Sequence, residues 1–230
     1  MDSGDTSKYF QSTCKRLAES FFNTSCEALA KNLLGKVLAR RLNDGCIIKG
    51  RIVETESYLG GEDAASQSYG NKVTPRNEPM FMSPGTAYVY FTYGMYHCFN
   101  ISSQGEGAAV LLRALEPLEN LERMTELRKR YRKSPKTTLK TKDLCNGPAK
   151  LCISLAIDIE TCNRQNLISW DGMWLEDDGQ DDLCKTIVAA PRIGINCEKK
   201  WQNKLLRFYI HDNPYVSKIE KAKMEFMQLP

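Results

Sequence analysis

The sequence predicts an α+β fold, in which a single domain is built on a curved antiparallel sheet with helices around it. Three observations favour this class. The 230 residues suffice for one well-buried domain. Two β-prone segments flank a tight-turn signal, and the helical segments do not alternate with strands as repeated βαβ units would. We expect the polar residues 1–15 to form a flexible N-terminal segment ahead of a domain at 16–230.

The first helix is expected where leucines recur at helical spacing after a capping residue. Ser25 can accept a hydrogen bond at the helix start, and Glu27 lies in the first turn. Leu29 and Leu33 follow on the apolar side, and Gly35 comes just past the predicted end.

A β-hairpin is predicted next, with strands at residues 37–42 and 46–58. The Asp44-Gly45 step between them tolerates the left-handed backbone that a tight turn requires. If no bulge interrupts the second strand, alternation places five residues on one face: Ile48, Ile52, Glu54, Glu56 and Tyr58. Two carboxylates then lie among apolar neighbours on one strand.

An uncharged, tyrosine-rich segment follows at residues 86–100. Nine consecutive positions of this segment contain four of the chain's ten tyrosines: Tyr88, Tyr90, Tyr93 and Tyr96. Such dense aromatic rings on a chain of net charge +4 are typical of a surface on which bases stack, or of a wedge entering a duplex. Tyrosine is also a common strand residue, so the alternative is that these rings fill a sheet core.

The later elements are a buried strand and a helix. Residues 110–115 are predicted to form the strand, in which Arg113 places a cation near the same sheet. Apolar residues at helical spacing follow Pro117, which is favoured in a first helical turn. These residues are Leu118, Leu121, Met124 and Leu127.

Two charged segments come after this helix. Eight of the residues from Arg128 to Lys142 are basic, and we expect a loop or a solvated helix end there. This basic block could attract phosphates, act as a nuclear import signal or simply keep the surface soluble. The acidic residues 176–182 are interpreted as a variable loop.

Composition excludes several classes of protein. Hydrophobic residues make up 42% and charged residues 26%, and no apolar stretch approaches the length of a membrane span. The nine cysteines are scattered without a C-x-x-C pair, and His97 and His211 lie far apart in the sequence. We therefore expect an intracellular, reduced protein with no metal and no cofactor.

The two strand carboxylates are the first candidates for chemistry. A carboxylate on an apolar strand needs a cation, hydrogen bonds or a raised pKa, and one held in this way can act as a general base. The alternative is that Glu56 is a structural carboxylate paired with Arg51 or Arg113, beside an ordinary core ring at Tyr58. Together with the tyrosine-rich segment and the basic block, these residues fit a pocket for a flat ring extruded from DNA.

Four segments carry a resemblance to a known family. They are RIVETESYLGGEDAASQS (51–68), TPRNEPMFMSPGTAYVYFTYGMYHCFNISSQGEG (74–107), LLRALEPLE (111–119) and NGPAKLC (146–152). They closely resemble the alkyladenine (3-methyladenine) DNA glycosylases, and the likeness runs from about residue 17 to residue 217. The segments are long, ordered and nearly gapless, so the match is highly specific.

The resemblance implies roles for individual residues. Glu56 matches the general base that activates the attacking water, and the backbone carbonyl of Ile193 and the guanidinium of Arg113 match groups that hold this water. Tyr58 and Tyr90 match the rings that sandwich the flipped base.

Other residues of the family contact DNA or select the base. Tyr93 matches the residue that intercalates into the gap left by the base, with Met95 wedged beside it. Asn100 matches the side chain that crowds the exocyclic amine of normal guanine. Three residues fall in segments that contact the DNA backbone: Thr74, Arg76 and Lys150.

One position departs from the family pattern. The family usually has a histidine eleven residues after the catalytic glutamate, where it hydrogen-bonds the flipped base, and this chain has Gln67. Glutamine offers an acceptor and donors but no proton that titrates near neutrality. We therefore expect base excision with an altered range of lesions.

The resemblance implies a monofunctional DNA glycosylase that initiates base excision repair. It would flip alkylated or deaminated purines (3-methyladenine, 7-methylguanine, hypoxanthine, ethenoadenine) from duplex DNA and leave an abasic site. We expect a monomer that works without a membrane, in the nucleus, or in the cytoplasm of a bacterial source. The alternative is a protein that binds damaged DNA without cleaving it. A zinc deaminase is a weaker option, because this chain lacks the His-x-Glu and Cys-x-x-Cys motifs that such an enzyme requires.

Overall fold

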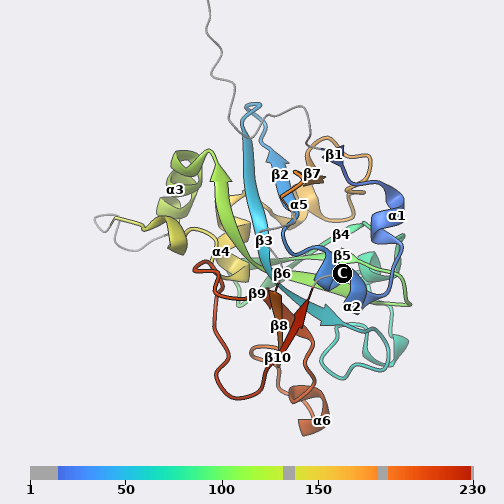
Figure 1. The fold of residues 1–230 in the computed structure, drawn as a ribbon. Coiled ribbons are helices and arrows are strands. Elements are labelled where there is room, and N and C mark those ends of the chain that lie inside the picture. Colours follow the sequence, from blue (N-terminus) through green and yellow to red (C-terminus); the bar gives the residue numbers. More distant parts are fainter. Residues whose placement is uncertain (1–14, 132–137, 181–185, 229–230) are drawn as a thin grey trace, which may run out of the picture.

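The computed structural model describes residues 15–131, 138–180 and 186–228 and contains one ten-stranded sheet (Figure 1). Every strand pairing in it is antiparallel, so the predicted α+β class is confirmed. The strands are β1 (Lys15–Arg16), β2 (Val37–Arg41), β3 (Ile47–Tyr58), β4 (Ala87–Thr92), β5 (Tyr96–Ser102), β6 (Ala109–Glu119), β7 (Met173–Asp177), β8 (Thr186–Ala190), β9 (Arg207–Ile210) and β10 (Glu225–Gln228). The predicted flexible segment lies outside the described residues, apart from its last residue in β1.

Short helices surround the sheet. They are α1 (Glu19–Phe22), α2 (Cys26–Asn32), α3 (Leu121–Arg130), α4 (Pro148–Ser154), α5 (Ile159–Cys162) and α6 (Lys199–Gln202), with single 3₁₀ turns at Tyr69–Asn71, Glu78–Phe81 and Thr141–Asp143. In Figure 1, α3 lies to one side of the sheet and α6 lies beyond β8 and β10, at the opposite end from β2.

The predicted helix after Ser25 is confirmed as α2. The Ser25 hydroxyl accepts a hydrogen bond from the backbone N–H of Ala28, and Gly35 follows with a left-handed φ of 87°. Helix α2 lies against β3, where the Thr55 hydroxyl donates to the carbonyl of Ala30 at 2.8 Å. This contact covers the part of β3 that carries the two glutamates.

Strand β3 is the point at which the sheet divides. One edge of β3 pairs with β2 near its start and with β9 near its end, while the other edge pairs with β6. The β3–β6 register shifts on both sides of Glu54, so the predicted alternation is interrupted there. A bulge bends a strand and increases its twist. The bend lets one edge of β3 pair first with β2 and then with β9.

The predicted helix after Pro117 begins later than the sequence indicates. Pro117 is in β6, which continues to Glu119, and α3 starts at Leu121. The proline is tolerated because the β3–β6 register shifts between Lys49 and Gly50, directly opposite it. The prediction of a first helical turn at Pro117 was therefore wrong.

The charged segments differ in part from the predicted loops. Arg128 is buried in α3 and donates to the carbonyls of Asp143 and Leu144, so it is not part of a solvated surface. Glu176 and Asp177 end β7 rather than forming a loop, because Lys49 and Lys36 pair with them. Residues 132–137 and 181–185 lie outside the described part of the chain.

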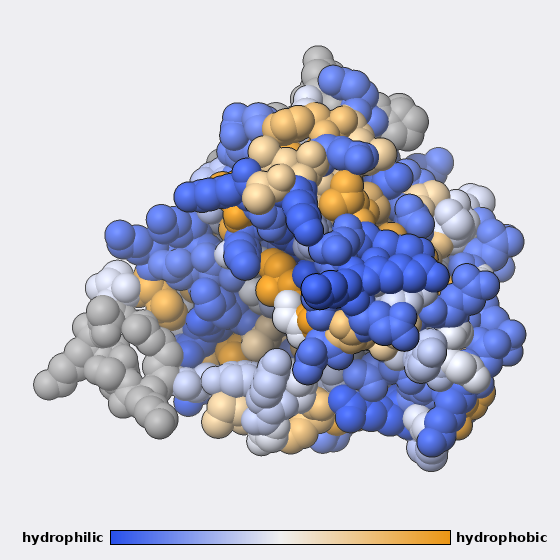
Figure 2. All heavy atoms as spheres, turned by 90° about the horizontal axis from the view of Figure 1, so that it is seen from below, coloured by the Kyte–Doolittle hydropathy of each residue, from blue (hydrophilic) through white to orange (hydrophobic). Residues whose placement is uncertain are grey.

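The apolar residues are gathered between the sheet and its helices. Fully buried side chains include Phe22 of α1, Leu29 of α2, Ile52 of β3 and Phe99 of β5. The face in Figure 2 consists mainly of hydrophilic residues, with hydrophobic patches between them. No helix in the described ranges is long and apolar enough to span a bilayer.

Candidate active site

A cavity of about 530 Å³ opens over the region where β3, β4, β5 and β6 meet the segment that follows β8. Most of the residues that the sequence singled out lie on its wall. These are Tyr58, Gln67, Arg76, Tyr90, Tyr93, Asn100, Arg113 and Ile193. The fold thus brings together segments that are distant in the sequence.

Glu56 lies behind this wall and is fully buried. Its Oε1 accepts a hydrogen bond from the backbone N–H of Ile193 at 2.7 Å and forms an ion pair with Arg113 Nη1 at 3.2 Å. Its Oε2 accepts a hydrogen bond from the Tyr58 hydroxyl at 3.0 Å. A buried charged carboxylate is tolerated only when donors satisfy it. These three donors satisfy the buried Glu56 side chain beside the cavity.

Glu54 is also fully buried but has a different environment. It contacts Arg113 Nε at 3.3 Å, Arg207 Nη1 at 2.9 Å and the backbone N–H of Ser217 at 2.8 Å. Of these groups only Arg113 lies on the cavity wall, whereas all three partners of Glu56 do. Glu54 therefore anchors Arg113, which in turn reaches Glu56.

The expected pairing of Glu56 is resolved by these contacts. Of the two proposed partners, Arg113 contacts Glu56, whereas Arg51 forms a bidentate pair with Asp178 at 2.7 and 3.2 Å. Arg51 also donates to the carbonyl of Gly35. It thus stabilises the β2–β7 side of the sheet, away from the cavity.

Two tyrosines form aromatic walls of the cavity. Burial, followed by the negative charge of Glu56, raises the pKa of Tyr58 well above its usual value, so the Tyr58 hydroxyl stays protonated and donates. Burial also raises the pKa of Tyr90. The Tyr90 ring packs against Tyr88 at a centroid distance of 5.3 Å, and the Arg76 guanidinium lies 5.1 Å from its centroid.

The tyrosine-rich segment forms the antiparallel β4–β5 pair and its turn. Tyr93 and Gly94 occupy the centre of this turn with φ values of 50° and 66°, and the N–H of Met95 donates to Thr92. Positive φ at both central positions matches the twist of hairpin strands. A bulky residue in this conformation is strained. Tyr93 is nevertheless 90% exposed, so it is not held there by core packing.

Gln67 and Asn100 both line the cavity. Asn100 is buried, and its side-chain amide donates to the carbonyl of Tyr88, its cross-strand partner, at 3.1 Å. Gln67 is exposed, and its backbone carbonyl accepts from the side chain of Asn77 at 2.8 Å. The backbone of Gln67 is thus held by Asn77 at the cavity wall.

Three predicted DNA contacts do not line the cavity. Thr74 is hydrogen-bonded to Asn77, and Met95 borders a smaller hollow beside α3. Lys150 donates to Asn146 at 2.7 Å, and burial lowers the pKa of its amine. These residues lie around the cavity rather than in it.

The sequence did not indicate two buried arginines. Arg207 contacts Glu54 from β9, and Arg192 forms an ion pair with Asp63 across 129 residues of sequence. Neither arginine has a local motif, because the partner of each lies in a distant segment. Within the described ranges, no group of three His, Cys, Asp or Glu side chains is placed to hold a metal ion.

Comparison with known proteins gives a consistent family. The model of the methylpurine-DNA glycosylase (MPG) family matches residues 20–214. DNA-3-methyladenine glycosylase of Mus musculus is 50% identical over 215 residues, which are 93% of this chain and 64% of that protein. The Homo sapiens protein of the same name is 49% identical over 208 residues, which are 90% of this chain and 70% of that protein.

A bacterial relative matches along nearly its whole length. The putative 3-methyladenine DNA glycosylase of Clostridium perfringens (strain SM101 / Type A) is 46% identical over 205 residues. These cover 88% of this chain and 99% of the bacterial protein. The family match at residues 20–214 includes the strands from β2 to β9 and the residues that line the cavity.

Proposed function

This chain belongs to the methylpurine-DNA glycosylase family, and we propose that it is a monofunctional DNA glycosylase that removes alkylated purines by hydrolysis. The observation that carries this proposal is the fully buried Glu56, held by three donors behind a cavity with tyrosine walls. The cavity is large enough for a flat purine, which enters only if the nucleotide leaves the duplex. The proposal therefore includes base flipping.

Glu56 acts as the general base in this mechanism. Cleavage of the N-glycosyl bond develops positive charge on the sugar, which a nearby carboxylate stabilises while it takes a proton from water. The family resemblance assigns the Arg113 guanidinium and the carbonyl of Ile193 to the attacking water. The contacts of Glu56 with Arg113 and with the N–H of Ile193 support this arrangement.

Tyr58 and Tyr90 hold the extruded base between them. An alkylated purine carries positive charge, and stacking a cation on an aromatic face contributes about 1 kcal/mol or more in a desolvated site. The same charge makes the base a good leaving group, so little acid assistance is needed. Asn100 crowds the exocyclic amine of normal guanine, and its bond to the carbonyl of Tyr88 supports a fixed position for this contact.

The hairpin turn enters the minor groove and replaces the extruded base. Tyr93 fills the gap and Met95 wedges beside it, while Thr74, Arg76 and Lys150 contact the DNA backbone. The exposed side chains of Tyr93 and Met95 at one turn support this role. The substrates extend to hypoxanthine and ethenoadenine, although Gln67 weakens the excision of such neutral lesions.

One chain carries all of these groups, so the enzyme acts as a monomer. In a eukaryotic cell it works in the nucleus, where genomic DNA is found, and in a bacterium it works in the cytoplasm. The exposed basic residues Lys129, Arg130, Lys140 and Lys142 add attraction for the DNA phosphates.

Release of base by the wild type and by Glu56→Gln tests the proposal. The substrate is a duplex with one 7-methylguanine or one hypoxanthine, and abasic product is measured under single-turnover conditions. We expect Glu56→Gln to reduce excision by about 10²-fold or more while it still binds the duplex. Glu54→Gln is the matched control, because it removes a buried carboxylate of the same strand whose contact with the cavity wall is through Arg113, while the contacts of Glu56 with Ile193 and Tyr58 stay in place. It should lower the melting temperature and keep measurable excision.

If wild type and Glu56→Gln both bind and neither releases base, the chain is a damage-binding protein rather than an enzyme. If Glu56→Gln excises as fast as wild type at equal DNA affinity, the assignment of the base to Glu56 is wrong.

A further inference from the structure

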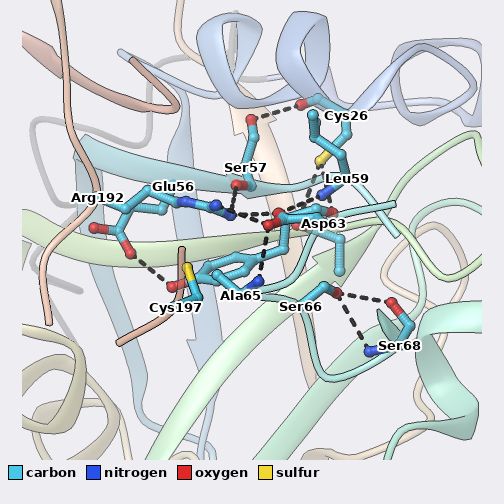
Figure 3. Close-up of polar contacts among 12 residues, drawn as sticks. Cys26, Glu56, Ser57, Leu59, Asp63, Ala65, Ser66, Ser68, Arg192 and Cys197 are labelled. Carbon is cyan, nitrogen blue, oxygen red and sulfur yellow. Dashed lines mark hydrogen bonds and ion pairs between the residues drawn. The ribbon is translucent and has the colours of Figure 1, made fainter. Parts of the chain in front are cut away.

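We propose that the buried pair Asp63–Arg192 positions the Glu56 carboxylate for catalysis, an inference that rests on the proposed function. Figure 3 shows Arg192 close to Glu56 and in contact with Asp63, which lies in the segment that follows β3. Both side chains are fully buried, and neither lines the cavity. Arg192 and Asp63 are therefore positioning residues, since neither can contact a base in the cavity.

Asp63 is fixed by the backbone around it. Its Oδ2 accepts from the N–H of Leu59 at 3.1 Å, and its Oδ1 accepts from the N–H of Ala65 at 3.0 Å. Both oxygens also accept from Arg192, with Nη2 at 2.8 Å from Oδ1 and Nη1 on Oδ2. A carboxylate with four such donors is a rigid anchor, because rotation would break several bonds at once.

Arg192 connects this anchor to strand β3. Its Nη1 also donates to the carbonyl of Ser57 at 2.9 Å, so one guanidinium joins β3, the segment after it and the segment after β8 (Figure 3). This arrangement depends on the planar fork of arginine, whose donors point in fixed directions. A lysine could keep the charge but could not make these three contacts in the same geometry.

Two of the three donors to Glu56 depend on Arg192. The backbone N–H of Ile193, which donates at 2.7 Å, belongs to the next residue in the chain. The Tyr58 ring, whose hydroxyl donates at 3.0 Å, has the Arg192 guanidinium 4.7 Å from its centroid. Arg113, the third donor, comes from β6 and is held separately by Glu54. Loss of the Arg192 contacts would therefore loosen Glu56 without removing its cation.

The test compares wild type with Arg192→Lys and Asp63→Asn. The excision rate of 7-methylguanine is measured with saturating enzyme in single turnover, and affinity is measured with a duplex that carries a stable abasic-site analogue. We expect both variants to lose between about tenfold and a hundredfold in rate, since small misplacement of a catalytic group has effects of this size. Affinity for the duplex should stay within about twofold, because the DNA-contacting turn is elsewhere.

Arg51→Lys is the matched control for a buried, bidentate pair. Arg51 makes equivalent contacts with Asp178 and Gly35 but lies away from the cavity. Arg51→Lys should lower the melting temperature, as Arg192→Lys should, and leave the excision rate within about twofold of wild type.

The inference is overturned if Arg192→Lys excises as fast as wild type, or if its rate and affinity fall together. If Arg192→Lys does not fold, Asp63→Asn decides the matter by the same two measurements. Failure of the wild type to release base would instead overturn the proposed function.

Discussion

The exposed tyrosine of the β4–β5 turn provides a sharp test of how the tyrosine-rich segment divides its roles. Tyr93 is 90% exposed, so Tyr93→Ala removes almost no buried area and should change the free energy of unfolding by less than about 0.5 kcal/mol. Stacking of one base on an aromatic ring is worth about 1–3 kcal/mol, which corresponds to a loss of about 5- to 150-fold in affinity for lesion DNA. We therefore expect a large change in binding with an unchanged fold.

Tyr88→Ala is the matched control in the same strand pair. Tyr88 is 1% exposed and packs on Tyr90, so its truncation should cost about 3–5 kcal/mol of stability. The assays are thermal unfolding and titration of a fluorescent duplex that contains one hypoxanthine. If Tyr93→Ala instead unfolds the protein as readily as Tyr88→Ala, or binds lesion DNA as tightly as wild type, the assignment of Tyr93 to the duplex is wrong.

Two further substitutions test the base pocket and the sheet. Gln67→His should raise the excision of ethenoadenine or hypoxanthine relative to that of 7-methylguanine, if the histidine that the resemblance implies at this position hydrogen-bonds the flipped base. Equal changes for both lesion classes, measured by single-turnover excision, would count against this. Asp178→Asn should lower the free energy of unfolding by about 1–3 kcal/mol near neutral pH, since Arg51 loses its charged partner. Burial alone would raise the pKa of Asp178, but the hydrogen bond and charge of Arg51 outweigh it and hold the pKa below 3.8. The contribution is therefore present above about pH 4 and is lost as the pH falls through the lowered pKa, so the difference in melting temperature should shrink in acid. A difference that persists unchanged at pH 2 would show that Asp178 acts through packing.

Much of the local structure followed from the sequence because its causes are local. Ser25 caps α2, and Gly45 supplies the left-handed turn between β2 and β3. The start of α3 was misplaced because proline favours a first helical turn, whereas here the neighbouring strand keeps Pro117 in β6. Pairing across a sheet overrides such a local preference.

The sequence by itself determined the family, the antiparallel α+β class and the two strand glutamates as candidates for chemistry. Only the tertiary structure decided which of them contacts the residues of the cavity wall, because the groups that pair with each carboxylate come from distant segments. Arg207 and Ser217 enclose Glu54, whereas Ile193 and Tyr58 hold Glu56 at the cavity wall. Burial makes these long-range contacts obligatory, since a carboxylate in the core must find its donors wherever the fold places them.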